Sequence, residues 1–69
     1  MNAKEAKEQS LWNDLHGDIK YYIKRSVELG VLYTKIDKRY MTEEAKHALQ
    51  TLGYTIFYNS TNDTYEIRW

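Results

Sequence analysis

Two short alternating segments near the carboxyl-terminal end constrain the fold of this chain more than any other feature. YTIFYN and TYEIRW, residues 54–59 and 64–69, alternate apolar and polar side chains with the two-residue period of a β-strand. Between them lies the tetrapeptide Ser-Thr-Asn-Asp, residues 60–63, whose residue types favour turns. The pattern therefore predicts a β-hairpin.

The register of this hairpin determines which side chains are buried. A turn centred on Thr61 and Asn62 places Tyr58 opposite Tyr65, Ile56 opposite Ile67 and Tyr54 opposite Trp69, all on one face. A shift by one residue would turn this whole apolar set to the other face. We expect the apolar face to lie under the helices, with Trp69 closing the core against Tyr54.

An amphipathic helix is predicted over residues 11–29. Its apolar residues recur every three or four positions: Leu11, Trp12, Leu15, Ile19, Tyr22, Ile23, Ser26 and Val27. Ser10 is a plausible N-cap, Gly30 stands where a C-cap glycine belongs, and residues 1–9 extend the helix or fray. Gly17 leaves one alternative open, a break followed by a second helix capped by Asp18.

The middle of the chain predicts a strand and a second, shorter helix. VLYTKID, residues 31–37, alternates β-branched and aromatic residues with polar ones. Thr42 is a natural N-cap for a helix that stops before Gly53. The predicted order is helix, strand, helix, strand, strand. We therefore expect one α+β domain, residues 1–69, in which two helices pack on one face of a three-stranded antiparallel sheet.

Composition and motifs argue against several chemistries. Ten basic residues balance ten acidic ones, and there is no cysteine. His16 and His47 lack the spacing of a zinc site, no Ser or Thr stands in a nucleophile motif, and three isolated glycines cannot form a phosphate loop. No apolar run approaches the roughly 20 residues of a membrane span. We therefore expect a soluble, non-enzymatic protein with no catalytic residues, no metal, no cofactor and no membrane partner.

Two surfaces are candidates for binding. Phe57 projects from the hairpin face opposite the core and, with Tyr33 and the helical Tyr21, is a candidate for self-association or a protein partner. An edge of the sheet is a further candidate for self-association. The basic residues that could bind nucleic acid are Lys20, Lys24, Arg25, Lys38 and Arg39. A helix followed by a hairpin also occurs in winged-helix DNA-binding domains. Acidic residues are interspersed among these basic ones, so nucleic-acid binding is the less favoured alternative.

The second part of the chain resembles a group of small, mostly uncharacterised proteins of tailed bacteriophages and prophages. Residues 26–69 carry the resemblance: a helix ending in glycine, a short strand, a helix finishing in L-x-x-L-G-Y, and a hairpin closing on I-x-W. The matching residues are Gly30, Leu49, Leu52, Gly53, Tyr54, Ile67 and Trp69. The resemblance implies the same α+β fold, an accessory or virion-associated role, and no catalytic or ligand residues. It also implies a host or virion protein as partner, in the host cytoplasm or the virion.

Overall fold

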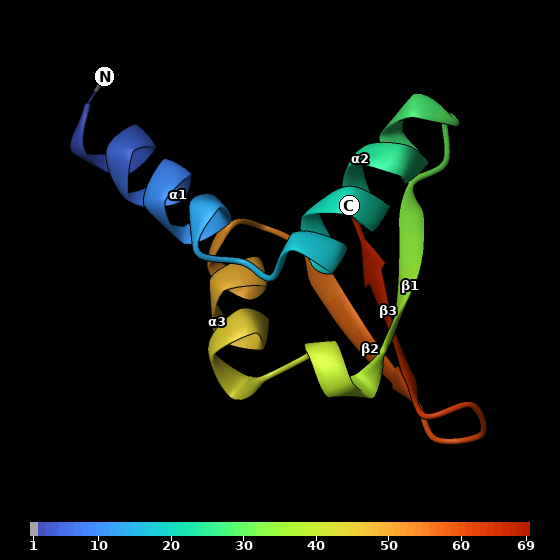
Figure 1. Ribbon diagram of the computed structural model, residues 1–69. Helices are drawn as coiled ribbons and strands as arrows, with labels where there is room; N and C mark the ends of the chain where they lie inside the picture. The colour runs from blue at the N-terminus through green and yellow to red at the C-terminus, as the bar shows by residue number, and fades with distance from the viewer. Residues whose placement is uncertain (1) are drawn as a thin grey trace.

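The computed structural model describes residues 2–69 and has an α+β fold (Figure 1). Met1, the first residue of the amino-terminal segment that was expected to extend the helix or fray, lies outside the described residues. The elements in chain order are α1 (Ala3–Asn13), α2 (Gly17–Glu28), β1 (Tyr33–Asp37), a 3₁₀ turn η1 (Lys38–Tyr40), α3 (Glu43–Thr51), β2 (Thr55–Asn59) and β3 (Thr64–Arg68). The predicted class and the three-stranded antiparallel sheet are confirmed.

The sheet has the order β1-β3-β2, so the last strand of the sequence lies in the centre. The hairpin register is the predicted one: Ile56 faces Ile67, and Tyr58 faces Tyr65. On its other side β3 pairs with β1, which puts Thr34 opposite Ile67. Ile67 therefore has a neighbouring strand on each side and helices above it, and its side chain is fully buried.

The helix expected over residues 11–29 is two helices, α1 and α2, separated at residues 14–16. The break turns Leu15 into the core, where it is 5% exposed. His16, rather than Asp18, caps α2, because its Nδ1 accepts a hydrogen bond from the backbone N–H of Asp18 at 3.1 Å. The break lets α2 pack on the sheet while α1 packs against α3, which one straight helix could not do.

Residues 3–9 are helical, so Ser10 is an interior residue of α1 and the prediction that it is the N-cap is wrong. The N-cap is Asn2, whose side-chain oxygen accepts a hydrogen bond from the N–H of Glu5 at 2.8 Å. Thr42 caps α3 as predicted, with its hydroxyl oxygen accepting from the N–H of Ala45 at 3.0 Å.

One hydrophobic core lies between the helices and the sheet. Its buried members are Leu15, Ile19, Ile23, Ile36, Met41, Ala45, Ala48, Leu49 and Ile67. Helix α2 packs on β1, and α3 packs on β2, so two helices cover one face of the sheet. Trp69 meets Tyr54 edge-on with ring centroids 5.9 Å apart, as expected. Trp69 is 36% exposed, however, so it closes the rim of the core rather than its centre.

Two residues assigned to the apolar side of the first helix, Tyr22 and Val27, are exposed. Helix α2 packs mainly on the single strand β1, so only the narrow stripe of Ile19, Ile23 and Ser26 is buried. None of the helices in residues 2–69 is long and apolar enough to cross a membrane.

Candidate protein-interaction surfaces

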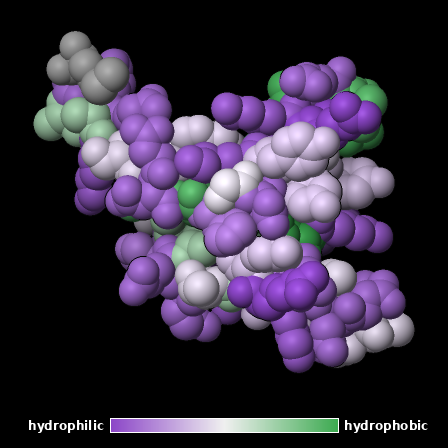
Figure 2. Space-filling view, in the orientation of Figure 1, coloured by the Kyte–Doolittle hydropathy of each residue, from purple (hydrophilic) through white to green (hydrophobic). Residues whose placement is uncertain are grey.

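The turn between α2 and β1 forms an exposed apolar surface, which we call the apolar corner. Its residues and their exposed fractions are Val27 at 59%, Leu29 at 66%, Val31 at 38% and Leu32 at 67%. Figure 2 shows strongly hydrophobic colouring at the upper right, over the α2–β1 turn. The four side chains are aliphatic and belong to one six-residue stretch, so they form a local cluster rather than scattered surface residues.

The backbone of the apolar corner is held by a Schellman motif at the end of α2. Gly30 has a φ of +77°, the N–H of Val31 donates to the carbonyl of Ser26 at 3.0 Å, and the N–H of Gly30 donates to the carbonyl of Val27 at 3.1 Å. The carbonyl of Leu32 accepts from the N–H of Trp69 at 3.1 Å, which ties the corner to the end of β3. The exposed aliphatic side chains therefore stand on a hydrogen-bonded turn.

The outer face of the sheet carries two of the predicted interface residues. Tyr33 and Phe57 both lie on the face turned away from the helices, about half exposed, on the two edge strands β1 and β2. Tyr33 faces Arg68, and Phe57 faces Glu66, both on the central strand β3. Arg68 forms an ion pair with Glu66 and its guanidinium carbon lies 5.1 Å from the centre of the Phe57 ring. One aromatic ring therefore lies on each edge of a polar central strip.

Tyr21, the third predicted interface residue, lies apart from the other two. It is exposed on α2 and contacts Tyr22 edge-on, with ring centroids 5.4 Å apart. Ile19 and Ile23, two residues to either side of it, point into the core, so Tyr21 points away from the sheet. The structure does not join Tyr21 to Tyr33 and Phe57 in one surface.

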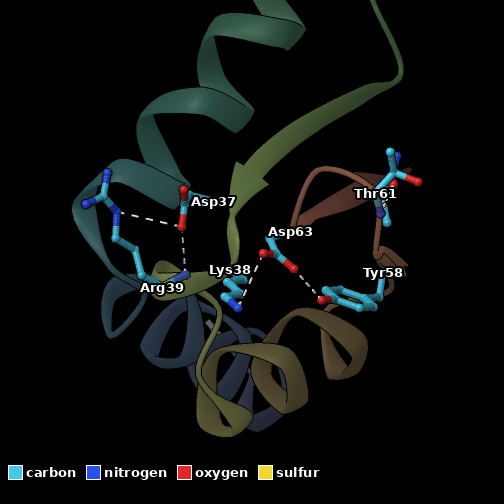
Figure 3. Close-up of polar contacts among 7 residues, drawn as sticks. Asp37, Lys38, Arg39, Tyr58, Thr61 and Asp63 are labelled. Carbon is cyan, nitrogen blue, oxygen red and sulfur yellow. Dashed lines mark hydrogen bonds and ion pairs between the residues drawn. The ribbon is translucent and has the colours of Figure 1, made fainter.

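The basic residues of the alternative function lie on two elements: Lys20, Lys24 and Arg25 on α2, and Lys38 and Arg39 on η1. Three of them already have partners within the chain. The ammonium group of Lys20 donates to the carbonyl of Asn13 at 3.2 Å, that of Lys38 lies 3.6 Å from an oxygen of Asp63, and Arg39 lies 3.7 Å from Asp37. Figure 3 shows the last two pairs. The carboxylates of Asp37 and Asp63 reduce the positive charge available to a polyanion at η1.

Asp63 also accepts a hydrogen bond from the hydroxyl of Tyr58 at 2.8 Å (Figure 3). This hydrogen bond, with the nearby charge of Lys38, lowers the pKa of Asp63 below its ordinary value. The same hydrogen bond is the main cause of the raised pKa of Tyr58. Burial alone raises the pKa of Tyr54. Each of these shifts accompanies a contact that holds the hairpin or the core.

A cleft of about 540 Å³ lies between the α1–α2 connection, η1 and the start of α3. Its lining includes His16, Tyr40 and Thr42. His16 and Thr42 use their acceptor atoms to cap α2 and α3, and the His16 ring packs against Tyr40 at 4.9 Å. These two polar side chains of the cleft thus act in the local structure. Within residues 2–69, no three His, Asp or Glu side chains come together as metal ligands.

The apolar corner was missed by the sequence reasoning. Val27 was assigned to the buried side of a helix, and Val31 and Leu32 to a strand, although β1 begins only at Tyr33. The stretch VELGVL contains the pattern that could have indicated the corner. It places four aliphatic residues around a helix-ending glycine, and such a turn lies at the surface, where it cannot bury all of them.

No protein-family model, curated protein or solved structure matches this chain. The resemblance of residues 26–69 to small phage and prophage proteins therefore stays a prediction.

Proposed function

We propose that this chain is a small, non-enzymatic protein-interaction module, and that it serves as an accessory or virion-associated component of a phage or prophage. Its partner would be a second copy of the chain, a host or virion protein, or both. The apolar corner carries the proposal, and the phage setting follows the resemblance of residues 26–69. The location would be the host cytoplasm or the virion.

The distribution of aliphatic residues supports an interaction role. The chain has only thirteen Leu, Ile and Val residues, and four of them, including both valines, lie in the apolar corner. A domain of this size buries only about 60% of its unfolded surface, so each aliphatic side chain left in water is a loss to its own core. Burying such a side chain contributes roughly 1.5–3 kcal/mol. A partner that covers the corner would recover part of that energy.

The corner suits a protein partner with an apolar surface. Its side chains have no hydrogen-bonding groups, so they can be recognised only by shape and burial. Its backbone is fixed by the Schellman hydrogen bonds, which reduces the entropy lost when a partner orders the turn. Exposed aromatic residues nearby, Tyr33 and Trp69, extend the area that a partner could cover.

The proposal is tested by replacing Leu29 and Leu32 with serine and measuring which proteins of the host-cell lysate the immobilised chain retains. Neither residue is buried, so circular dichroism should show an unchanged fold. We expect the wild type and the matched control Tyr22→Ser, an exposed residue outside the corner, to retain the same partner in comparable amounts. The Leu29→Ser/Leu32→Ser variant should lose it. Equal retention by all three proteins would contradict the role of the corner, and no retained protein at all would contradict a host partner.

Nucleic-acid binding is the second candidate, and one observation favours it. In the part of the chain that the structure describes, Lys24 and Arg25 form no ion pair, and Lys20 lies one turn before Lys24 on α2. Retention on heparin that is lost in a Lys24→Ala/Arg25→Ala variant, and that falls steeply with salt, would support this function. Passage of the wild type through heparin without retention would exclude a strong polyanion site.

A further inference from the structure

Strand β2 is an edge strand without protection against pairing. Its sequence, Thr-Ile-Phe-Tyr-Asn, contains no charged residue and no proline. It pairs with β3 on one side only, so alternate residues direct their N–H and C=O groups away from the sheet. Within residues 2–69 no other backbone hydrogen-bonds to these groups. Such an edge is a template for a further strand.

The other edge strand of the sheet, β1, differs from β2 because it carries charged residues. Strand β1 has Lys35 at its centre and Asp37 at its end, both on the outer face. If β1 paired antiparallel with its counterpart in a second copy about its central residue, two copies of Lys35 would face each other directly. Like charges in that position oppose pairing, and lysine on an edge strand is a common protection. The same operation on β2 places two copies of Phe57 face to face.

We propose that a second copy of this chain pairs its β2 antiparallel with this β2, about a two-fold axis at Phe57. This inference rests on the proposed function, and it names the second copy as the partner and the β2 edge as its site. Thr55 then faces the partner's Asn59, and Ile56 faces the partner's Tyr58. The result is a six-stranded sheet with β1 at both outer edges, and every β2 position meets an uncharged residue.

The exposed side chains of β2 agree with a second copy of the chain as the partner. Phe57 and Tyr58 are each about half exposed, one on either face of the strand, so pairing would cover apolar surface on both faces. The Arg68 guanidinium already lies over the Phe57 ring and holds it in place within the chain. Five paired residues bury less than the roughly 1,200 Å² of a standard interface, so we expect a weak dimer that forms with increasing concentration.

Cysteine cross-linking tests the register, and the chain is suited to it because it has no cysteine of its own. The variants Thr55→Cys and Asn59→Cys are mixed in equal amounts under mild oxidation, and the disulfide-linked species are separated by mass. The proposed register brings a thiol at 55 opposite one at 59, at a Cβ separation of about 4.5–5.5 Å. Two thiols at position 55 would lie about 13 Å from direct opposition. We expect the mixed disulfide to exceed either homodimer several-fold, and Lys35→Cys to cross-link only at the slow collisional rate.

The molar mass in solution tests the dimer itself, from about 10 µM to about 1 mM, a range that covers the affinities expected of small interfaces. The wild-type mass should rise from 8.3 kDa towards twice that value. Phe57→Lys should stay monomeric, because it creates facing lysines in the dimer, whereas within the chain the new lysine faces Glu66 favourably. The matched control Tyr33→Thr removes the aromatic residue of the other edge and should behave as wild type.

A wild type that stays at 8.3 kDa throughout, or a purely statistical mixture of disulfides, would overturn the proposal. The cross-linking result does not depend on Phe57→Lys folding, so a failure of that variant to fold leaves the register test in force. Loss of the β2 dimer with intact partner retention by the apolar corner would leave the proposed function standing. If the β2 dimer forms but the corner variant retains the partner as well as the wild type does, the role of the apolar corner is contradicted and the dimer stands.

Discussion

Asp63, in the turn of the hairpin, contacts both β2 and the residue that follows β1. Its φ of +52° is in the left-handed region, which aspartate tolerates better than most residues other than glycine. Its backbone carbonyl accepts from the N–H of Lys38 at 3.1 Å, and its carboxylate contacts both Tyr58 and Lys38. One turn residue thus connects the β2–β3 hairpin to the end of β1.

The stability supplied by this carboxylate should depend on pH. The folded-state pKa of Asp63 lies below its ordinary value of 3.8, so the stability that the carboxylate contributes is complete above that value and is lost as the pH falls through the folded pKa. The raised pKa of Tyr58 has the opposite effect. The stability that the Tyr58 hydroxyl contributes is complete below pH 10.0 and is lost as the pH rises through the folded pKa. We expect the melting temperature of the wild type to fall at both ends of this range.

Two variants test whether the Asp63 carboxylate and the Tyr58 hydroxyl cause this pH dependence. Asp63→Asn keeps a residue that tolerates positive φ and removes the titrating carboxylate, so its melting temperature should fall less between pH 5 and pH 2 than that of the wild type. Tyr58→Phe removes the hydroxyl donor and should reduce the loss above pH 10. Parallel melting profiles for the wild type and Asp63→Asn would show that the Asp63 contacts contribute nothing measurable.

Ile67 and Ile56 offer a matched test of burial on one face of the sheet. They are the same residue type and face each other, but Ile67 lies on the central strand with no exposed surface, whereas Ile56 is half-buried on the edge strand. Ile67→Ala should reduce the free energy of unfolding by about 2–5 kcal/mol, and Ile56→Ala by clearly less. Urea denaturation measures both. Equal losses would mean that the edge strand is as closely packed as the centre.

At the scale of elements, two helices end in the same way. After α3, Gly53 has a φ of +99°, the N–H of Tyr54 donates to the carbonyl of Leu49, and that of Gly53 donates to the carbonyl of Gln50, each at 3.0 Å. This repeats the Schellman geometry at Gly30. The motif turns the chain directly from α3 into β2, which sets the start of the hairpin and the position of Tyr54 at the rim of the core.

Replacement by alanine should have opposite effects on stability at Gly53 and at Gly17. Gly53→Ala forces a side chain into the left-handed region and should destabilise by about 1–2 kcal/mol. Gly17 is the first residue of α2, has no positive φ, and a methyl group there would meet no atom within 4 Å. Gly17→Ala should therefore stabilise by about 0.4–1 kcal/mol. Thermal unfolding measures the change in stability of both variants. A loss of stability in Gly17→Ala would show that the helix break needs glycine.

The sequence allowed most elements to be predicted because their patterns are local. The two-residue period of residues 54–59 and 64–69 fixed the hairpin register, and Thr42 marked the start of α3. The break after α1 was left open because its cause is tertiary: Leu15 is buried in a core built from other elements, and periodicity alone does not show that. The apolar corner was missed for the same reason, since the exposure of Val27 depends on how far α2 overlaps β1.

At the scale of the whole molecule, the two proposed surfaces lie at different places. The apolar corner precedes β1, whereas the proposed dimer edge is β2, and β3 separates these strands. Pairing through β2 would therefore leave both apolar corners free. A dimer of this kind would present two equivalent binding surfaces, which increases the apparent affinity for a partner that is itself repeated.

Helix α1 makes the molecule elongated. The principal extents are 41 × 27 × 18 Å and the radius of gyration is 12.0 Å, compared with about 11 Å expected for a compact chain of this length. Figure 1 shows α1 extending from the body towards the amino terminus. No residue of α1 is buried, and only Leu11 and Trp12, near its end, pack against the core.

Removal of residues 1–7 should therefore change the free energy of unfolding by less than about 1 kcal/mol, because the described part of the deleted segment buries no side chain and makes only local hydrogen bonds. In the full chain, Trp12→Ala should cost about 2–3 kcal/mol, since a partly buried aromatic ring is lost from the core rim. Guanidinium denaturation followed by circular dichroism compares the two. The deletion could instead reduce the free energy of unfolding as much as Trp12→Ala does. In that case the first two turns of α1 stabilise the packing of Leu11 and Trp12 on α3, and the whole helix contributes to stability rather than only its carboxyl-terminal end.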